Sequence, residues 1–94
     1  MGSAVIESTP DIEYRQDISN IYANKVILYN DDFNSFYHVE KCLVKICCKS
    51  KAESKRIALE AHNNGKAVCY TGSMEACETV AEKMGEANLT VSIE

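Results

Sequence analysis

The sequence predicts an α+β fold, a sandwich in which three helices cover one face of a three-stranded, mainly antiparallel sheet. Three observations predict it: three short runs of β-forming residues, three segments of helical periodicity, and their order β-α-α-β-α-β. Two successive helices between the first two strands are not typical of an all-parallel βαβ repeat. The 94 residues correspond to one domain of ordinary size.

The first strand and the first helix are separated by a polar turn. Lys25–Tyr29 is a short run of β-forming residues. Asn30–Asp32 ends it, because Asn and Asp side chains hydrogen-bond the neighbouring backbone and favour turns. Apolar residues then recur at steps of three and four, which predicts a helix of about 13 residues, capped by Asn34 or Ser35. Its apolar stripe comprises Phe36, Val39, Leu43, Ile46 and Cys47.

The second helix carries start and stop signals at its two ends. Ser50-Lys-Ala-Glu53 has the pattern of a capping box, in which the serine side chain accepts from the backbone three residues on. Asn63-Asn64-Gly65 is a stop signal, because glycine readily adopts the left-handed conformation that ends a helix. The apolar stripe between them comprises Ile57, Ala58 and Ala61.

A strand, a helix and a strand complete the chain. Lys66–Thr71 is the second strand, and Gly72 turns the chain after it. Ser73 caps the third helix, which Gly85 ends. Leu89–Ile93 alternates strictly between apolar and polar residues and is the third strand. The stripe of the third helix comprises Met74, Cys77, Val80 or Ala81, and Met84.

Composition and charge exclude several classes of protein. Ten Lys and Arg against 14 Asp and Glu give a net charge of −4, which argues against a nucleic-acid partner, since such proteins cluster basic residues. No apolar run approaches the roughly 20 residues of a membrane span, so no membrane partner is expected. The first residues also lack the basic and apolar regions of a secretory signal. We expect a monomer.

Most of the negative charge belongs to the first 22 residues. Four acidic residues stand there against Arg15 alone, a net of −3, and the rest of the chain sums to −1. This stretch also contains the sole proline and shows no sustained period, which predicts a flexible acidic tail over residues 1–22 and a core domain over residues 23–94. The alternative is an ordered arm that packs Ile18, Ile21 and Tyr22 on the body.

The five cysteines point to a reducing compartment. An odd number without a regular framework is not typical of a secreted disulfide scaffold, so we expect thiols that serve as small buried apolar groups. His38 and Cys42 share a helical face, but no CxxC pair accompanies them, and we expect no metal site. The cysteines are Cys42, Cys47, Cys48, Cys69 and Cys77.

Catalytic signatures are missing from the sequence. It contains no glycine-rich phosphate loop, no Ser/His/Asp signature and no HExxH motif. A thiol–imidazole pair of Cys69 and His62 is the one alternative, although their positions do not specify contact. We therefore expect no enzyme, no catalytic residue and no cofactor.

A cluster of polar residues is the strongest candidate site. Asn30–Asp32 follows the first strand, and His62 lies near the end of the second helix, so the two can meet at one edge of the domain. A carboxylate, an amide oxygen and an imidazole acceptor suit a cationic ligand with several N–H donors, such as an ammonium group. The alternative is turn chemistry for the first group and a helix-dipole role for the histidine.

Three stretches carry a resemblance to a known family. The first is Lys25-Val-Ile-Leu-Tyr-Asn-Asp-Asp-Phe-Asn-Ser-Phe-Tyr-His-Val39, the second is Ala61-His-Asn-Asn-Gly-Lys-Ala-Val68, and the third is Glu75-Ala-Cys-Glu78. They resemble the ClpS family, the N-end-rule adaptors of Clp proteases, over about residues 24–94, and they are closer to its cyanobacterial and plastid-like branch. The family fold is a β-α-α-β-α-β sandwich.

The resemblance implies a site that reads the first residue of a protein substrate. Asn30, Asp32 and His62 would bind the protonated α-amino group, with Asp31 nearby and the His62 ring neutral. The substrate's first side chain would enter an apolar pocket beside this polar rim. Phe36 stands at a gate where many relatives have Met, and the choice between Leu and Phe, Tyr or Trp stays open. By position, the pocket walls comprise Asn34, Phe36, Val39, Ala58, Ala61 and Leu89.

The resemblance also implies partners and a compartment. The chain would deliver N-degron substrates to a hexameric Clp AAA+ unfoldase of the ClpC or ClpA type, which Glu75 and Glu78 would face. The tail would engage the unfoldase during delivery, in the cytoplasm or a compartment like the plastid stroma. The alternative is a regulator of the same fold that docks on the Clp ATPase without reading N-terminal residues.

Overall fold

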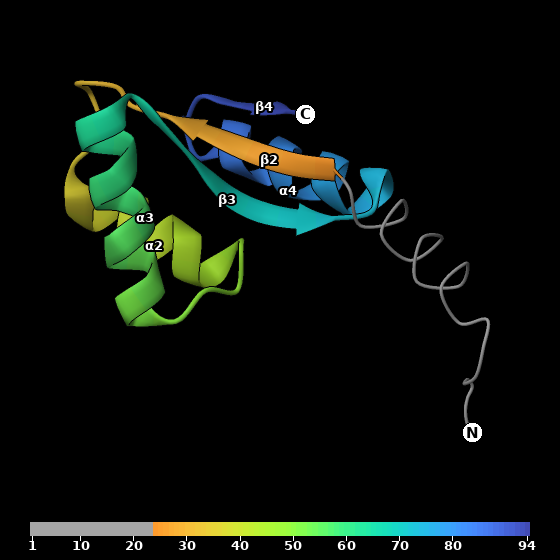
Figure 1. Cartoon of the computed structure of the whole chain (residues 1–94), viewed down its shortest axis with the longest axis horizontal. Helices are drawn as coiled ribbons and strands as arrows, with labels where there is room; N and C mark the ends of the chain where they lie inside the picture. The colour runs from red at the N-terminus through yellow and green to blue at the C-terminus, as the bar shows by residue number, and fades with distance from the viewer. Residues whose placement is uncertain (1–23) are drawn as a thin grey trace.

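The computed structural model describes residues 24–94 (Figure 1). The expected tail of residues 1–22 lies outside the described residues, as does the first residue of the expected domain over 23–94. The predicted order β-α-α-β-α-β and the α+β class are confirmed. The elements are β2 (Asn24–Tyr29), α2 (Phe36–Lys45), α3 (Lys51–Asn64), β3 (Lys66–Gly72), α4 (Met74–Glu86) and β4 (Val91–Ile93).

The sheet has β2 at its centre, with the strand order β3-β2-β4 and both pairs antiparallel. Side chains alternate between its two faces. Val26 and Leu28 on β2 and Cys69 on β3 point to the helices and are at most 2% exposed, whereas Val68, which precedes Cys69, is 41% exposed. One face of the sheet is therefore covered by helices, as predicted, and α4 runs along it behind β2 and β4 in Figure 1.

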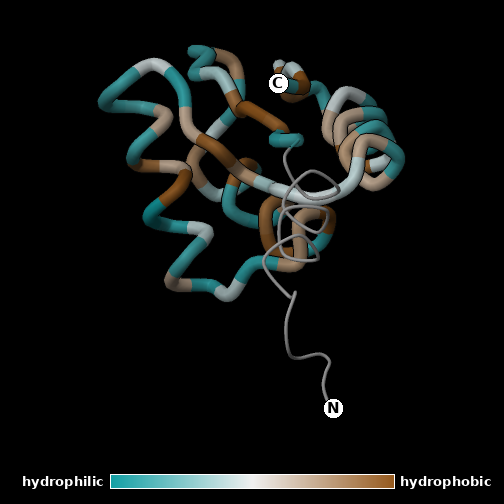
Figure 2. The backbone as a smooth tube through the Cα atoms, turned by 45° about the vertical axis from the view of Figure 1, so that its right-hand side comes forward, coloured by the Kyte–Doolittle hydropathy of each residue, from teal (hydrophilic) through white to brown (hydrophobic). Residues whose placement is uncertain are grey.

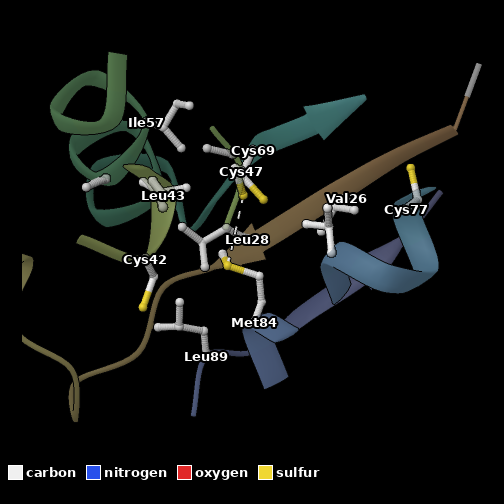
Figure 3. Packing of buried hydrophobic residues seen from close by; sticks show 14 residues of the cluster. Val26, Leu28, Cys42, Leu43, Cys47, Ile57, Cys69, Cys77, Met84 and Leu89 are labelled. Atoms are coloured by element: carbon white, nitrogen blue, oxygen red, sulfur yellow. Dashed lines mark hydrogen bonds between the residues drawn. The ribbon is translucent and has the colours of Figure 1, made fainter. Parts of the chain in front are cut away.

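One apolar cluster joins all six elements. Leu43 of α2, Ile57 of α3 and Met84 of α4 are at most 1% exposed and pack on the sheet (Figure 3). The hydrophobic stretches of the backbone, brown in Figure 2, accordingly gather toward the middle of the molecule. Because a domain this small has a thin core, each of these side chains carries a sizeable share of the stability.

Four of the five cysteines belong to this core, and Cys48 does not. Figure 3 shows Cys47 and Cys69 side by side, with the Cys47 thiol 4.0 Å from the Met84 sulfur. The hydrogen bond with Cys47 and burial raise the pKa of the Cys69 thiol, which keeps it protonated and unreactive. Cys48 adopts a positive φ of 59° in the segment after α2 and is exposed, so the expectation of buried thiols is wrong at this position.

Several element boundaries differ from the prediction. β2 begins at Asn24 rather than Lys25, and β3 includes Gly72, which was expected to turn the chain. The first helix has 10 residues, because the chain turns at Cys48 and the Lys49 N–H donates to the Leu43 carbonyl. The third helix continues one residue past Gly85 to Glu86. The last strand is shorter than expected, since the Leu89 N–H is bound to the Met84 carbonyl at the end of α4 and cannot join the sheet.

Serine caps begin all three helices, as the sequence predicts at Ser50 and Ser73 and, for the first helix, at Ser35 rather than Asn34. In each, the serine side chain accepts a hydrogen bond from the backbone N–H three residues later. At the other end of α3, Gly65 has a φ of 90°, the left-handed conformation expected of its stop signal. These local signals set where α3 ends and place His62 in its last turn.

Replacing Gly65 and Gly85 by alanine should change stability in opposite directions. A Cβ at either glycine meets nothing within 4 Å, so the backbone decides the outcome. Gly65→Ala should lower the free energy of unfolding by about 1 kcal/mol, because an L-residue is strained at positive φ. Gly85→Ala, inside α4, should raise it by up to about 1 kcal/mol. Urea titration measures both, and a shift of the same sign in both variants would contradict this account.

Candidate functional site

The pairing of β2 with β3 brings the two predicted parts of the site together. The two strands run antiparallel with Tyr29 opposite Lys66, so the residue after β2 meets the residue before β3. The Asn30 N–H donates to the Gly65 carbonyl over 3.0 Å, and the Gly65 N–H donates to the Ala61 carbonyl one helical turn back. His62 follows Ala61 directly, so the end of β2 and the end of α3 form one edge of the domain.

A small pocket opens between these two ends. Its cavity volume is about 50 Å³. Four polar side chains line it: Asn30, Asp31, Asn34 and His62. The remaining lining residues are Leu28, Tyr29, Phe36, Val39, Ala58, Ala61 and Leu89. Leu28, Ala58, Ala61 and Leu89 among them are at most 5% exposed, so the inner part of the pocket is apolar and continuous with the core.

Asp31 organises the turn between β2 and α2. Its Oδ1 accepts from the backbone N–H groups of Phe33 (2.9 Å) and Asn34 (2.8 Å), and its Oδ2 accepts from the Asn34 side-chain amide (2.9 Å). Burial opposes the charge on Asp31, but these hydrogen bonds outweigh it and lower the pKa of the carboxyl below its ordinary value. The pocket therefore has a carboxylate that is ionised at neutral pH.

Asn34 connects this turn to the far side of the pocket. The same amide nitrogen that donates to Asp31 also donates to the Asn88 carbonyl over 2.9 Å. Asn88 directly precedes Leu89, which lies on the pocket wall. Because its amide nitrogen makes two hydrogen bonds, the Asn34 side chain is held in one orientation and ties the β2–α2 turn to the segment after α4.

Phe36 and His62 face each other at the exposed side of the pocket. Their ring centroids are 5.2 Å apart with an interplanar angle of 61°, an edge-on arrangement. Phe36 is the first residue of α2 and is 44% exposed, and His62 lies in the last turn of α3 and is also exposed. These two rings therefore form a rim that joins the two helices at the pocket entrance.

The structure separates the two neighbouring carboxylates. Asp31 lines the pocket, whereas Asp32 is exposed and does not line it. Within residues 24–94, the Asp32 side chain makes no hydrogen bond or ion pair, so its two oxygens are available to a ligand. All other residues predicted for the α-amino group and the pocket lie along this one cavity.

The sequence reasoning missed two lining residues, Leu28 and Tyr29. They are the last residues of β2, and their position directly before Asn30 was the available signal. The Tyr29 hydroxyl is 2.9 Å from the Ser92 hydroxyl of β4, which fixes this wall of the pocket from the neighbouring strand.

The other sequence candidates lie outside the pocket. Glu75 and Glu78 are exposed in the first half of α4. Cys69 is fully buried in the core and does not line the pocket with His62, so the thiol–imidazole alternative has no geometry to support it. His38 Nε2 is 2.8 Å from the Ala87 carbonyl and donates to it, which ties α2 to the segment after α4.

Two other kinds of feature, a metal-binding cluster and a membrane-spanning helix, are absent from the part of the chain that the structure describes. In residues 24–94, no three His, Cys, Asp or Glu side chains are grouped so that they could share a metal ion. Over the same residues, no helix combines the length and the apolar character that crossing a bilayer requires.

Comparisons with known proteins identify a family and agree with the fold. The family model described as "ATP-dependent Clp protease adaptor protein ClpS" matches residues 22–91. Adapter proteins named ClpS from Nostoc sp. and Synechocystis sp. are 34% and 33% identical over 79 and 94 residues. These matches cover 82% and 98% of this chain and 81% and 95% of the relatives, and they confirm the predicted similarity to the cyanobacterial branch.

A solved structure is similar over most of its length. It is that of Agrobacterium tumefaciens ClpS2 bound to L-phenylalaninamide, with 27% sequence identity and a TM-score of 0.67. The match covers 76% of this chain and 93% of that one. Since the family model spans well over half of the chain and the relatives share about a third of their residues with it, this chain belongs to the ClpS family of Clp protease adaptor proteins.

Proposed function

We propose that the chain is an adaptor that binds the free N-terminal residue of N-degron proteins and delivers these proteins to a Clp AAA+ unfoldase. The single observation that carries the proposal is the pocket itself, in which polar acceptors stand directly beside an apolar wall. L-Phenylalaninamide, the ligand of the solved relative, has the same two parts, a free α-amine and an apolar side chain.

The polar side of the pocket suits an α-ammonium group. Such a group has three N–H donors and one positive charge, and Asn30, His62 and the carboxylates offer acceptors and the opposite charge. We assign different tasks to the two carboxylates. Asp31 is occupied by three hydrogen bonds and shapes the turn, whereas Asp32 is free to meet the incoming amine.

Neither half of the pocket accounts for useful affinity alone. A charge-assisted hydrogen bond contributes roughly 1.5–3 kcal/mol. Burial of a Leu or Phe side chain contributes about 1.5–3 kcal/mol more. Micromolar binding takes about 8 kcal/mol. The amine and the side chain must therefore be bound together, which distinguishes an N-terminal residue from the same residue within a chain.

Membership of the ClpS family supports a proposal for the partners and the compartment. We propose that the chain works as a monomer, that Glu75 and Glu78 on the exposed face of α4 contact a hexameric unfoldase of the ClpC or ClpA type, and that neither nucleic acid nor membrane takes part. The proposal involves no catalytic step and no cofactor. The five free cysteines support a reducing compartment such as the cytoplasm or plastid stroma.

Acetylation of a peptide's α-amine should strongly weaken binding. A peptide that begins with Leu or Phe should bind, and its N-acetylated form should bind at least roughly ten-fold more weakly, because acetylation removes the charge and two donors. His62→Ala should weaken the binding of the free peptide but change the binding of the acetylated peptide little. Asn63→Ala, a change at the exposed neighbouring residue, is the matched control. Fluorescence anisotropy measures the binding of both peptides to the unmodified chain and to the two variants. Equal binding of both peptides, or of neither, would favour the regulator that docks without reading N-termini.

Asp31→Asn and Asp32→Asn should have different effects on stability, because the two carboxylates have different tasks. Asp32→Asn should weaken peptide binding with little change in unfolding, since this side chain is exposed. Asp31→Asn should weaken binding and also lower stability, because the turn loses its charged acceptor. Folding lowers the pKa of Asp31, so its contribution to stability is present above the ordinary carboxyl pKa and is lost as the pH falls through the lowered value.

The pH dependence of the unfolding free energy tests the role of Asp31. The difference in unfolding free energy between the unmodified chain and Asp31→Asn should shrink as the pH falls below about 4. A stability loss in Asp32→Asn as large as that in Asp31→Asn would contradict the division of tasks.

Phe36→Ala should shift the pocket's preference toward aromatic first residues. The cavity of about 50 Å³ is far smaller than the roughly 150 Å³ cavity that admits benzene in an engineered lysozyme, so an aromatic side chain requires the Phe36 ring to move aside. Removal of the ring should raise the affinity for a Phe peptide relative to a Leu peptide several-fold. Phe33→Ala is the matched control, because Phe33 is 95% exposed and does not line the pocket. An unchanged Phe-to-Leu ratio would contradict this role.

A further inference from the structure

A second hollow lies between α2 and α3, away from the residues that line the pocket. It has a volume of about 430 Å³. We call it the basic groove and define it by Tyr37, Lys41, Val44 and Lys45 of α2 and Lys51 and Lys55 of α3. Glu40 is the one acidic residue on its lining. The basic groove thus gathers four lysines in a domain whose residues 23–94 sum to a net charge of −1.

These lysines are not paired with the acidic residues of their own helices. Both ion pairs found within residues 24–94 belong to Arg56, which binds Glu53 and Glu60 on α3. The Lys41 ammonium lies 5.9 Å from the centre of the Tyr37 ring, a cation–π contact that places its charge in the groove. Arg56 therefore pairs with both acidic residues of α3, and the four lysines of the basic groove share its lining with a single acidic residue, Glu40.

The groove also exposes apolar surface. Tyr37 is 72% exposed and Val44 is 40% exposed, and both line it. Exposed apolar side chains amid like charges favour a partner that combines acidic and apolar residues, rather than a small inorganic anion.

The first residues of the same chain have this chemistry. Residues 7–17, which we call the acidic segment, contain Glu7, Asp11, Glu13 and Asp17 against Arg15, a net of −3. Ile12 and Tyr14 stand between the acids. Four acids and two large apolar residues therefore match four lysines and two exposed apolar residues.

The chain is long enough for this contact within one molecule. An extended chain spans at most about 3.3–3.6 Å per residue, so the seven residues from Asp17 to Asn24 reach roughly 23–25 Å and the 13 from Asp11 roughly 43–47 Å. A domain of this size has a radius of gyration of only about 11 Å. The part of the acidic segment that precedes Ile12 can accordingly reach any face of the domain, and Asp17 can reach the faces nearer to Asn24.

We propose that the acidic segment, residues 7–17, binds the basic groove of its own chain. The contact rests on charge complementarity and holds the segment on the surface formed by α2 and α3. It does not depend on whether the pocket reads N-terminal residues. Because individual exposed ion pairs are weak and are screened by salt, the contact is reversible and sensitive to ionic strength.

The test compares two double variants of the full chain that lose the same charge. Lys45→Gln/Lys55→Gln removes two lysines of the basic groove, and Lys66→Gln/Lys83→Gln removes two exposed lysines elsewhere. In 15N-labelled protein at low salt, amide signals of the acidic segment should shift in the groove variant and stay in place in the control. Equal shifts in both variants, or none in either, would overturn the proposal.

Three further measurements make the assignment specific. Glu13→Gln/Asp17→Asn should shift the amide signals of Val44 and Lys51, the reciprocal effect. Raising the salt from about 0.01 M to 1 M shortens the screening length from about 30 Å to 3 Å. The amide signals of the acidic segment in the unmodified chain should therefore move toward their positions in the groove variant. The shifts should be unchanged on dilution, because a concentration dependence would assign the groove to a second copy's segment instead and overturn the contact within one chain.

Discussion

The antiparallel pairing of β2 with β3 is the constraint on which the rest of the structure depends. It places the end of one strand against the start of the other, and the hydrogen bond from Asn30 to Gly65 closes that edge. Without it, the polar turn after β2 and the last turn of α3 would have no reason to meet. The same pairing sets the side-chain alternation that directs Leu28 and Cys69 into the core. The pairing of β2 with β3 therefore places a polar turn beside apolar core residues, and this gives the pocket its polar and apolar sides.

The order and type of the elements could be predicted because they depend on signals from residues that are close in the sequence. Ser50 and Ser73 begin helices, and Gly65 ends one at positive φ, all through hydrogen bonds or backbone preferences of near neighbours. Boundaries set by the turn that ends a helix were harder to predict from the pattern. Leu89 has the alternation of a strand residue, but its N–H is bound by the Met84 carbonyl five residues back, in the turn after α4 where Asn88 adopts a positive φ of 69°.

The candidate site was predictable to a similar degree. The sequence indicates that Asn30 and His62 can meet and which apolar residues stand beside them, and these residues line the cavity. The sequence does not distinguish the two adjacent aspartates, Asp31 and Asp32. Their difference arises because Asp31 accepts from the backbone at Phe33 and Asn34 and is held in place, while Asp32 points to solvent. The size of the pocket likewise depends on where the Phe36 ring rests, which is set by its edge-on contact with His62.

The exposed thiol of Cys48 is a site for selective chemical labelling. Four of the five sulfurs are buried in the core, and only Cys48, in the turn between α2 and α3, meets solvent. A thiol-directed dye or spin label added to the folded chain would therefore attach at one position without any engineering of the other cysteines. That position adjoins the two helices that form the basic groove and is separated from the pocket by the length of α2. A reporter attached there would sense events on one surface while leaving the other undisturbed.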